Sequence, residues 1–286
     1  MSIRIIKYIN LSFLVFALLI LSCSDKKYKE YDKVNILKSE DSSQKETQNI
    51  IFPSGFKSTQ QLIIETSFSK VNVSAWPLDS IVVNHSNYDP EIMQVELYEG
   101  QNQLIYREKS NTKFKGELNI KVPENVNLNI KNQYGHLIIE GIKGTFDVNS
   151  IAGNILIENC ESAMKILCQS GKIHAINWAQ RGRTKMTSAS GSVIIQSKDN
   201  INYALNIHSG SDTVGVYLNG NTLRCNVEAL KFQDKGKIES DFDFGQSQQF
   251  YSDALEIYYD QYKMNIIDNA PLLSISTGDG IIILNK

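Results

Sequence analysis

Residues 144–160, GTFDVNSIAGNILIENC, are followed at residues 162–178 by a stretch of the same pattern, SAMKILCQSGKIHAINW. The two stretches align on Gly153 and Gly171. The same glycine recurs at intervals of 18 to 20 residues through residues 126–214, at Gly135, Gly153, Gly171, Gly191 and Gly210. A repeat of this length is typical of stacked supersecondary units, so the sequence predicts a solenoid of successive turns, which we call rungs.

Apolar and polar positions alternate on both sides of each glycine. The apolar columns stand seven and five positions before the glycine and two and four positions after it. They are Leu128, Phe146, Met164, Thr184 and Tyr203; Ile130, Val148, Ile166, Met186 and Leu205; Leu137, Ile155, Ile173, Val193 and Asp212; and Ile139, Ile157, Ala175, Ile195 and Val214. Side chains two positions apart lie on one face of a strand, so these columns predict two short strands per rung around one core.

The residues just before each glycine are small or polar and predict a corner, where glycine can adopt a positive φ without strain. The position three before the glycine holds Asn132, Ser150, Cys168, Ser188 and Ile207. Stacked about 4.8 Å apart, the small polar groups are expected to form a hydrogen-bonded ladder inside the bend. The same frame fits residues 62–76, with Ser69 in the glycine position, and residues 273–284, with Gly280.

These patterns predict an all-β fold, a single-stranded right-handed β-helix with rungs of about 18–20 residues. Alternating segments in residues 81–123 predict a small antiparallel meander near its N-terminal end. Regular rungs are expected in residues 124–214, an irregular insertion in residues 219–265 and a final rung in residues 270–286. Within the insertion, residues 246–262 are polar, rich in tyrosine and without a clean period, which predicts a loop or a short helix.

The N-terminus has the features of a secreted lipoprotein. Residues 1–22 combine a basic start with a short apolar run, and residues 20–23 resemble the lipobox of bacterial lipoproteins. The resemblance implies cleavage before Cys23, acylation of that cysteine, and a lipidated, flexible tether over residues 23–50. We therefore expect a protein of the bacterial cell envelope, lipid-anchored to the outer membrane on its periplasmic face or at the surface. The alternative is an uncleaved membrane anchor, which the shortness of the apolar run disfavours.

Charge and cysteine content exclude several classes of function. There are 29 Lys and Arg against 31 Asp and Glu, with no long basic run, so nucleic acid is not an expected partner. Apart from Cys23, the cysteines are Cys160, Cys168 and Cys225, an odd number. Cys160 and Cys168 fall in different inward columns and are expected to be buried and unpaired. Neither a zinc-ligand spacing nor a cofactor motif occurs, so no metal or cofactor is expected.

Several segments together resemble a known family of bacterial lipoproteins. They are the lipobox, the Leu-x-Ile-x-Val-Pro segment at residues 118–123, the Ser, Val, Val and Trp of residues 69–76, and the repeated Gly-x-Ile-x-Ile rungs. The family is the putative-adhesin family of β-strand-repeat proteins, related to the head domains of autotransporter adhesins. The resemblance covers about residues 56–286 and implies a β-solenoid, but no catalytic residues. Residues 219–265 depart from the family pattern.

Two pairs of charged residues are candidate site residues. Glu140 and Glu158 both stand five after the glycine, so they are expected one rung apart, about 4.8 Å, where they could bind a cation or act as an acid/base pair. A solvated surface ladder is the alternative that we favour. Arg181 and Arg183 form, with Lys185, a small basic group that could meet a phosphate or a uronate, although a polar corner loop is the simpler interpretation.

One column is apolar where the pattern predicts an outward face. Three positions after the glycine stand Ile138, Leu156, His174 and Ile194, with Ile283 in the last rung. Either another segment covers this column or it forms an exposed strip, and we favour coverage by the meander or the insertion. The histidines His136, His174 and His208 fall in different columns, so no metal site is expected.

The sequence as a whole predicts a non-enzymatic scaffold, adhesion or binding role, with an unidentified protein or glycan as ligand and no catalytic residue. The alternatives are a polysaccharide-active β-helix enzyme and an envelope sensor or regulatory partner. Strands near Leu62 and Ile282 are expected to end the solenoid. The apolar run at residues 281–284 is expected to pair on one side with an earlier rung and to be covered on its outer face by residues 219–265.

Overall fold

The computed structural model describes residues 48–52, 61–86, 93–98, 103–108, 116–253, 257–265 and 268–286. Over these ranges the chain forms strands and no helix, which confirms the all-β prediction. None of these residues belongs to a helix with the length and apolarity to cross a membrane.

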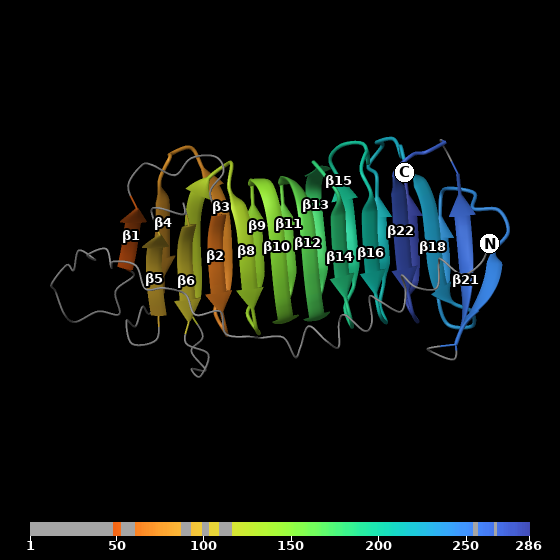
Figure 1. Ribbon diagram of the computed structural model, residues 1–286, viewed down its shortest axis with the longest axis horizontal. Helices are drawn as coiled ribbons and strands as arrows, with labels where there is room; N and C mark the ends of the chain where they lie inside the picture. Colours follow the sequence, from red (N-terminus) through yellow and green to blue (C-terminus); the bar gives the residue numbers. More distant parts are fainter. Residues whose placement is uncertain are drawn as a thin grey trace.

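The strands form two sheets that run the length of the molecule (Figure 1). Sheet A contains, in spatial order, β1 (Gln48–Phe52), β4 (Ile81–His85), β7 (Glu117–Pro123), β3 (Lys70–Trp76), β9 (Leu137–Glu140), β11 (Ile155–Glu158), β13 (Ile173–Gln180), β15 (Val193–Ser197), β17 (Val214–Tyr217), β23 (Ile281–Asn285) and β19 (Lys237–Ser240). Sheet B contains β5 (Met93–Tyr98), β6 (Gln103–Glu108), β2 (Gln61–Thr66), β8 (Asn127–Asn132), β10 (Lys143–Ala152), β12 (Glu161–Ser170), β14 (Thr184–Ser188), β16 (Leu205–Ser209), β22 (Leu272–Thr277), β18 (Asn226–Phe232), β21 (Ile257–Met264) and β20 (Gln248–Ser252). Each regular rung gives one strand to each sheet.

Successive rungs pair in parallel, in the register that the repeat predicts. Phe146 lies between Leu128 and Met164 in sheet B. Ile155 lies between Leu137 and Ile173 in sheet A. All of these side chains are buried, and each fully buried aliphatic side chain contributes about 1.5–3 kcal/mol. The core therefore lies between the two sheets, and the predicted β-solenoid is confirmed.

The last regular rung departs from the predicted register by two residues. Ser209 pairs with Ser188, so Asp212 rather than Gly210 stands at the corner. The backbone N–H of Asp212 donates to Ser209 Oγ at 3.0 Å, and the Asp212 carboxylate accepts the N–H of Thr213 at 2.6 Å. The inward columns continue with Leu205, Ile207, Val214 and Val216 instead of Tyr203, Leu205, Asp212 and Val214. A register shift of two residues keeps the same side chains facing the core. The alternation of apolar and polar residues alone therefore did not reveal the shift.

The polar ladder inside the corner is present, with Ser209 taking the place predicted for Ile207. Ser188 Oγ donates to the Gly171 carbonyl of the preceding rung at 2.9 Å and accepts the N–H of Gly191 at 2.9 Å. Ser209 Oγ makes the equivalent bond to the Gly191 carbonyl at 2.9 Å. Each small side chain thus satisfies backbone groups of two rungs.

At both ends of the solenoid, the order of the rungs in space differs from their order along the chain. β2 and β3 lie between the rung of β6 and β7 and the rung of β8 and β9. β22 and β23 lie between β16 and β17 on one side and β18 and β19 on the other, as Figure 1 shows for β22. The prediction that strands near Leu62 and Ile282 end the solenoid is therefore wrong. The pairing of residues 281–284 with an earlier rung is confirmed, and the insertion contributes β19, which pairs with their other edge.

Antiparallel strands extend both ends of sheet B and one end of sheet A, whereas the other end of sheet A is the parallel strand β19. At one end β4 pairs with β7 and β1, and β5 pairs with β6; at the other, β21 pairs with β18 and β20. Because β6 and β7 also run parallel to β2 and β3, part of the predicted meander forms a further rung. The loop or short helix predicted for residues 246–262 is wrong. This segment contributes β20 and β21, since pairing with β18 supplies partners that the local sequence does not reveal.

Buried charged groups occur near both ends of the solenoid. Lys231 Nζ lies 2.7 Å from Asp260 Oδ2, and both residues are 7% exposed. Toward the other end, Glu108 accepts the N–H of Ser67 at 2.9 Å and lies 3.8 Å from His85 Nε2. Burial acts to raise the pKa of Glu108, but hydrogen bonds from His85, Ser69 and the backbone hold this pKa below its usual value. Removing one partner of a buried ion pair is strongly destabilising, because it leaves the other charge uncompensated.

Candidate functional site

The outer face of sheet A carries the apolar column noted in the sequence. Leu156 pairs with Ile138 on one side and with His174 on the other, and His174 pairs with Ile194. All four side chains are partly exposed. Among the described elements, β11 and β15 contact their neighbours within sheet A. In the described parts of the meander and the insertion the expected cover is not found, because their strands extend the sheets at the ends instead of folding across this face.

A shallow depression of about 390 Å³ lies in this face. Its floor includes Leu156, His174 and Ile194, and its rim includes Asn154, Lys172 and Ser192. Burial lowers the pKa of His174, although the Glu158 carboxylate acts in the opposite direction, so the ring is neutral at neutral pH. His174 Nε2 is buried without a hydrogen-bond partner in the described part of the chain.

A row of hydrogen-bond donors borders one flank of the column. His136, Asn154 and Lys172 stand one after the glycine in three successive rungs, and all three are exposed. The N–H of Asn154 donates to His136 Nδ1 at 3.0 Å, and the N–H of Lys172 donates to Asn154 Oδ1 at 3.1 Å. Because these acceptor atoms are occupied, the neutral His136 carries its proton on Nε2, and Asn154 offers its Nδ2 hydrogens. The flank therefore presents donors at the spacing of the rungs.

Two carboxylates border the other flank. Glu140 and Glu158 are register partners in β9 and β11, one rung apart as predicted. Within the described ranges, no group of three or more His, Cys, Asp or Glu side chains could hold a metal ion. The structure does not bring Arg181 or Arg183 to these carboxylates, since both follow the end of β13 at the next corner.

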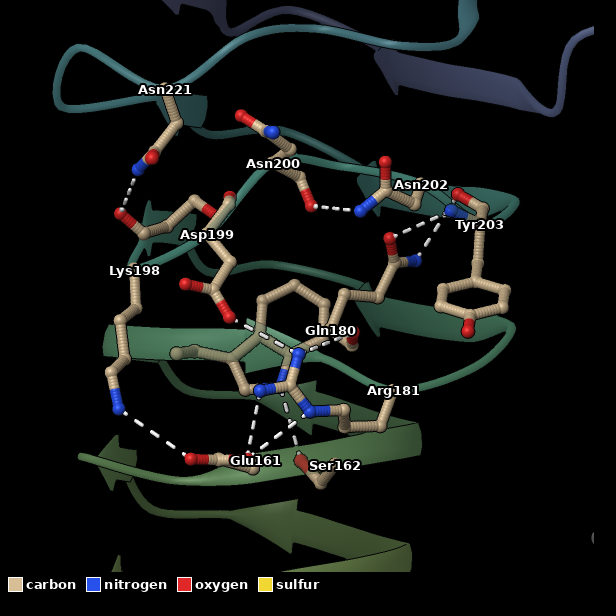
Figure 2. Close-up of polar contacts among 12 residues, drawn as sticks. Glu161, Ser162, Gln180, Arg181, Lys198, Asp199, Asn200, Asn202, Tyr203 and Asn221 are labelled. Carbon is tan, nitrogen blue, oxygen red and sulfur yellow. Dashed lines mark hydrogen bonds and ion pairs between the residues drawn. The ribbon is translucent and has the colours of Figure 1, made fainter.

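Arg181 belongs to a separate charged cluster (Figure 2). Its guanidinium lies 2.8 Å from Glu161 and 3.1 Å from Asp199, and Lys198 lies 3.5 Å from Glu161. The hydrogen bond from Arg181 lowers the pKa of Glu161. Two cations and two anions balance one another here, so the cluster ties neighbouring rungs together, in agreement with the polar-corner interpretation. Arg183 lies exposed, two residues after Arg181.

Comparison with known proteins identifies the family. Residues 41–238 match the model of the Toastrack DUF4097 family. The chain belongs to this family. A solved structure described as a "putative cell adhesion protein" from Clostridium sporogenes is 14% identical, with 84% of this chain and 99% of that chain covered and a TM-score of 0.36. A "putative adhesin" from Bacteroides fragilis is 11% identical, with 84% and 98% covered and a TM-score of 0.46. No curated protein sequence matches the chain.

One buried cluster in this Toastrack chain resembles a catalytic arrangement in composition but not in geometry. Ser69 Oγ lies 3.5 Å from His85 Nε2, and Glu108 Oε1 lies 3.8 Å from the same nitrogen. A serine relay needs the hydroxyl and the carboxylate on different ring nitrogens, and it needs access to substrate. All three residues are buried, so the cluster is structural.

The cysteines offer no reactive group within the described ranges. Cys160, Cys168 and Cys225 are unpaired and buried, as predicted for the first two. Burial raises the pKa of Cys160 to about 11 and that of Cys225 to about 12, which keeps both as thiols. Cys23, the predicted lipidation site, lies outside the described residues.

Sequence reasoning missed the donor row beside the apolar column. A signal for it exists, because His136, Asn154 and Lys172 share one position relative to the glycine. The side-chain hydrogen bonds that turn their donors outward become apparent only from the coordinates.

Proposed function

We propose that the protein is a lipid-anchored component of the bacterial cell envelope with a non-enzymatic binding role, and that it binds its partner through the outer face of sheet A. One observation carries the proposal, the partly exposed apolar column of Ile138, Leu156, His174 and Ile194. Contiguous apolar surface on a soluble domain is typical of an interaction site, because burying it on binding is favourable.

The opposite face supports this choice. The outward column of sheet B is polar, with Asn129, Asp147, Lys165 and Lys185 in register. Asp147 and Lys165 pair with each other at 3.7 Å. The two faces of the solenoid therefore differ in chemistry although both come from the same repeat, and only one has the character of a binding surface.

The membrane anchor in this proposal rests on the lipobox at residues 20–23. Several acyl chains on Cys23 would hold the protein at the membrane durably, since one chain alone gives only reversible binding. The absence of convergence between Glu140, Glu158 and Arg181 favours binding over polysaccharide cleavage.

The test is co-sedimentation of the full-length, detergent-solubilised protein with envelope fragments of the producing cells. Leu156→Asp should lower retention to the level that the acyl anchor alone gives on plain lipid vesicles, because it places a carboxylate in the middle of the column. Leu167→Asp is the matched control, because Leu167 is also outward-facing and partly exposed but lies in sheet B. Equal retention of both variants and of the parent protein would contradict the proposal.

A further inference from the structure

The proposed binding face has a chemistry specific enough to name its ligand class. We infer that the outer face of sheet A binds a linear, neutral glycan laid along the solenoid axis, across the depression formed by β11, β13 and β15. This inference rests on the proposed function and adds the ligand class and its orientation.

The floor of the depression suits the C–H face of a sugar ring. Leu156 and Ile194 give it an apolar surface on either side of the His174 ring. The His174 ring is partly exposed between them, although its Nε2 is buried and out of a ligand's reach. The C–H face of a pyranose can cover Leu156, His174 and Ile194 together, and the hydroxyls of the sugar then lie at the edges of the depression.

A ligand that contacts both flanks needs groups that can both donate and accept hydrogen bonds. On one side His136, Asn154 and Lys172 offer donors, because their acceptor atoms are occupied or absent. On the other side Glu140 and Glu158 offer acceptors in the rungs of β9 and β11, whereas Ile176 takes this position in β13, so the glycan extends from the depression over β9. A hydroxyl group can do both, so a chain with hydroxyls at both edges and an apolar face between them is complementary to this surface. An acyl chain fits the floor but leaves both flanks unpaired.

The spacing of the rungs selects a glycan over an extended peptide. Rungs repeat at about 4.8 Å, the distance between neighbouring strands. An extended peptide presents side chains on one face about every 6.7 Å and would fall out of step with the rungs after one repeat. Monosaccharide units of an extended glycan repeat close to the rung spacing, so equivalent hydroxyls can meet equivalent donors in successive rungs.

The charge on the flanks favours a neutral chain. Glu140 and Glu158 lie beside the apolar column, whereas Lys172 is the charged group on the rim of the depression. An anionic glycan would be attracted by Lys172 but repelled by the two carboxylates, so a polyuronate is disfavoured. Binding of a neutral chain should also be insensitive to salt.

The experiment measures Leu156-dependent retention, which is the difference between the full-length protein and its Leu156→Asp variant, on envelope fragments after separate treatments. Both proteins carry the same acyl anchor, so the difference excludes its contribution. One portion is oxidised with periodate, which cleaves sugar diols, and then quenched; a second is digested with protease; a third is extracted with organic solvent to remove lipid. Retention should be lost after periodate and kept after protease, lipid extraction and high salt. Lys172→Ala should weaken it about three- to tenfold, the value of one hydrogen bond. Lys185→Ala, an exposed lysine on sheet B, should leave it unchanged.

Each treatment separates this inference from the proposed function. Loss after protease digestion, with retention still dependent on Leu156, would mean a protein partner and would overturn the glycan assignment alone. Loss after lipid extraction would overturn it in favour of a lipid ligand. Retention that does not depend on Leu156 would overturn both. Thermal unfolding of each variant beside the parent protein checks that the loss is not due to misfolding.

Discussion

Replacing Gly153 with alanine would test how closely the rungs approach one another at the glycine corner. Gly153 has a φ of +109°, and a Cβ atom there would lie 2.2 Å from the Gly135 carbonyl oxygen of the preceding rung. The rungs would have to separate by about 1 Å to restore ordinary van der Waals contact. Two backbone hydrogen bonds hold these two rungs together at this point, from the N–H of Ala152 to the Gln133 carbonyl at 2.6 Å and from the N–H of Leu137 to the Asn154 carbonyl at 2.9 Å.

The magnitude follows from these contacts. Losing the two hydrogen bonds forfeits about 1 kcal/mol each. Holding an L-residue at positive φ adds about 1–2 kcal/mol. Gly153→Ala should therefore lower the free energy of unfolding by about 3–4 kcal/mol, a large part of the stability of a typical domain. Gly245 is the matched control, because it has a φ of +65° but no atom within 4 Å of an added Cβ. Gly245→Ala should lose only the conformational part, about 1–2 kcal/mol.

Urea unfolding of the full-length protein, followed by tryptophan fluorescence, measures both variants. Trp178 is buried in the rung after that of Gly153, so its emission reports on the affected region. Equal destabilisation by the two substitutions would show that glycine is needed at the corner only for its backbone conformation. It would also refute the argument from close approach.

The remaining predictions concern the anchor, the core and the ends of the solenoid. Cys23→Ala should abolish fatty-acid labelling and release the protein from the membrane fraction; unchanged labelling would rule out the lipobox. Ile166→Asp should unfold the middle rungs, because a carboxylate in this buried position costs several kcal/mol, whereas Leu167→Asp next to it should change the melting temperature little. Deleting residues 281–286 removes β23 from between β17 and β19 and should give insoluble or oligomeric protein on size-exclusion chromatography. Since folding lowers the pKa of Glu108, its stabilising effect should be full above the ordinary pKa of glutamate and lost as the pH falls through the lowered value. Glu108→Gln should flatten this acid limb in a denaturation series.

The sequence predicts the rungs well because their inward columns are set by burial, which repeats from rung to rung. Phe146, Met164 and Ile166 face the core as the alternation requires. The corner at Asp212 was not predictable from the glycine repeat, because an aspartate side chain closes that bend by its own hydrogen bond.

The order of the end rungs was not predictable either. A rung such as that of β22 and β23 has the same column pattern wherever it is inserted, so the pattern cannot say which rungs are its neighbours. Antiparallel pairing at the ends likewise depends on contacts between distant segments, as for β18 and β21. The buried pair of Lys231 and Asp260 is of this kind, since the two residues become neighbours only through that pairing.

Part of the candidate surface was visible in the sequence and part was not. The apolar column and the stacking of Glu140 and Glu158 follow from position within the repeat. Whether the column is covered depends on the path of the meander and the insertion, which local patterns do not determine. The two arginines at the next corner share the charge expected for an anion site, but Arg181 is engaged with Glu161 and Asp199.

Photo-crosslinking in intact cells tests most directly whether the outer face of sheet A is the binding surface. A benzoylphenylalanine placed at position 156 lies in the apolar column, and one placed at position 167 lies on the outer face of sheet B. Irradiation should give a heavier adduct from position 156 alone, and periodate should shift this adduct back toward the mass of the protein. No adduct at position 156, or equal adducts at both positions, would contradict the assignment of this face.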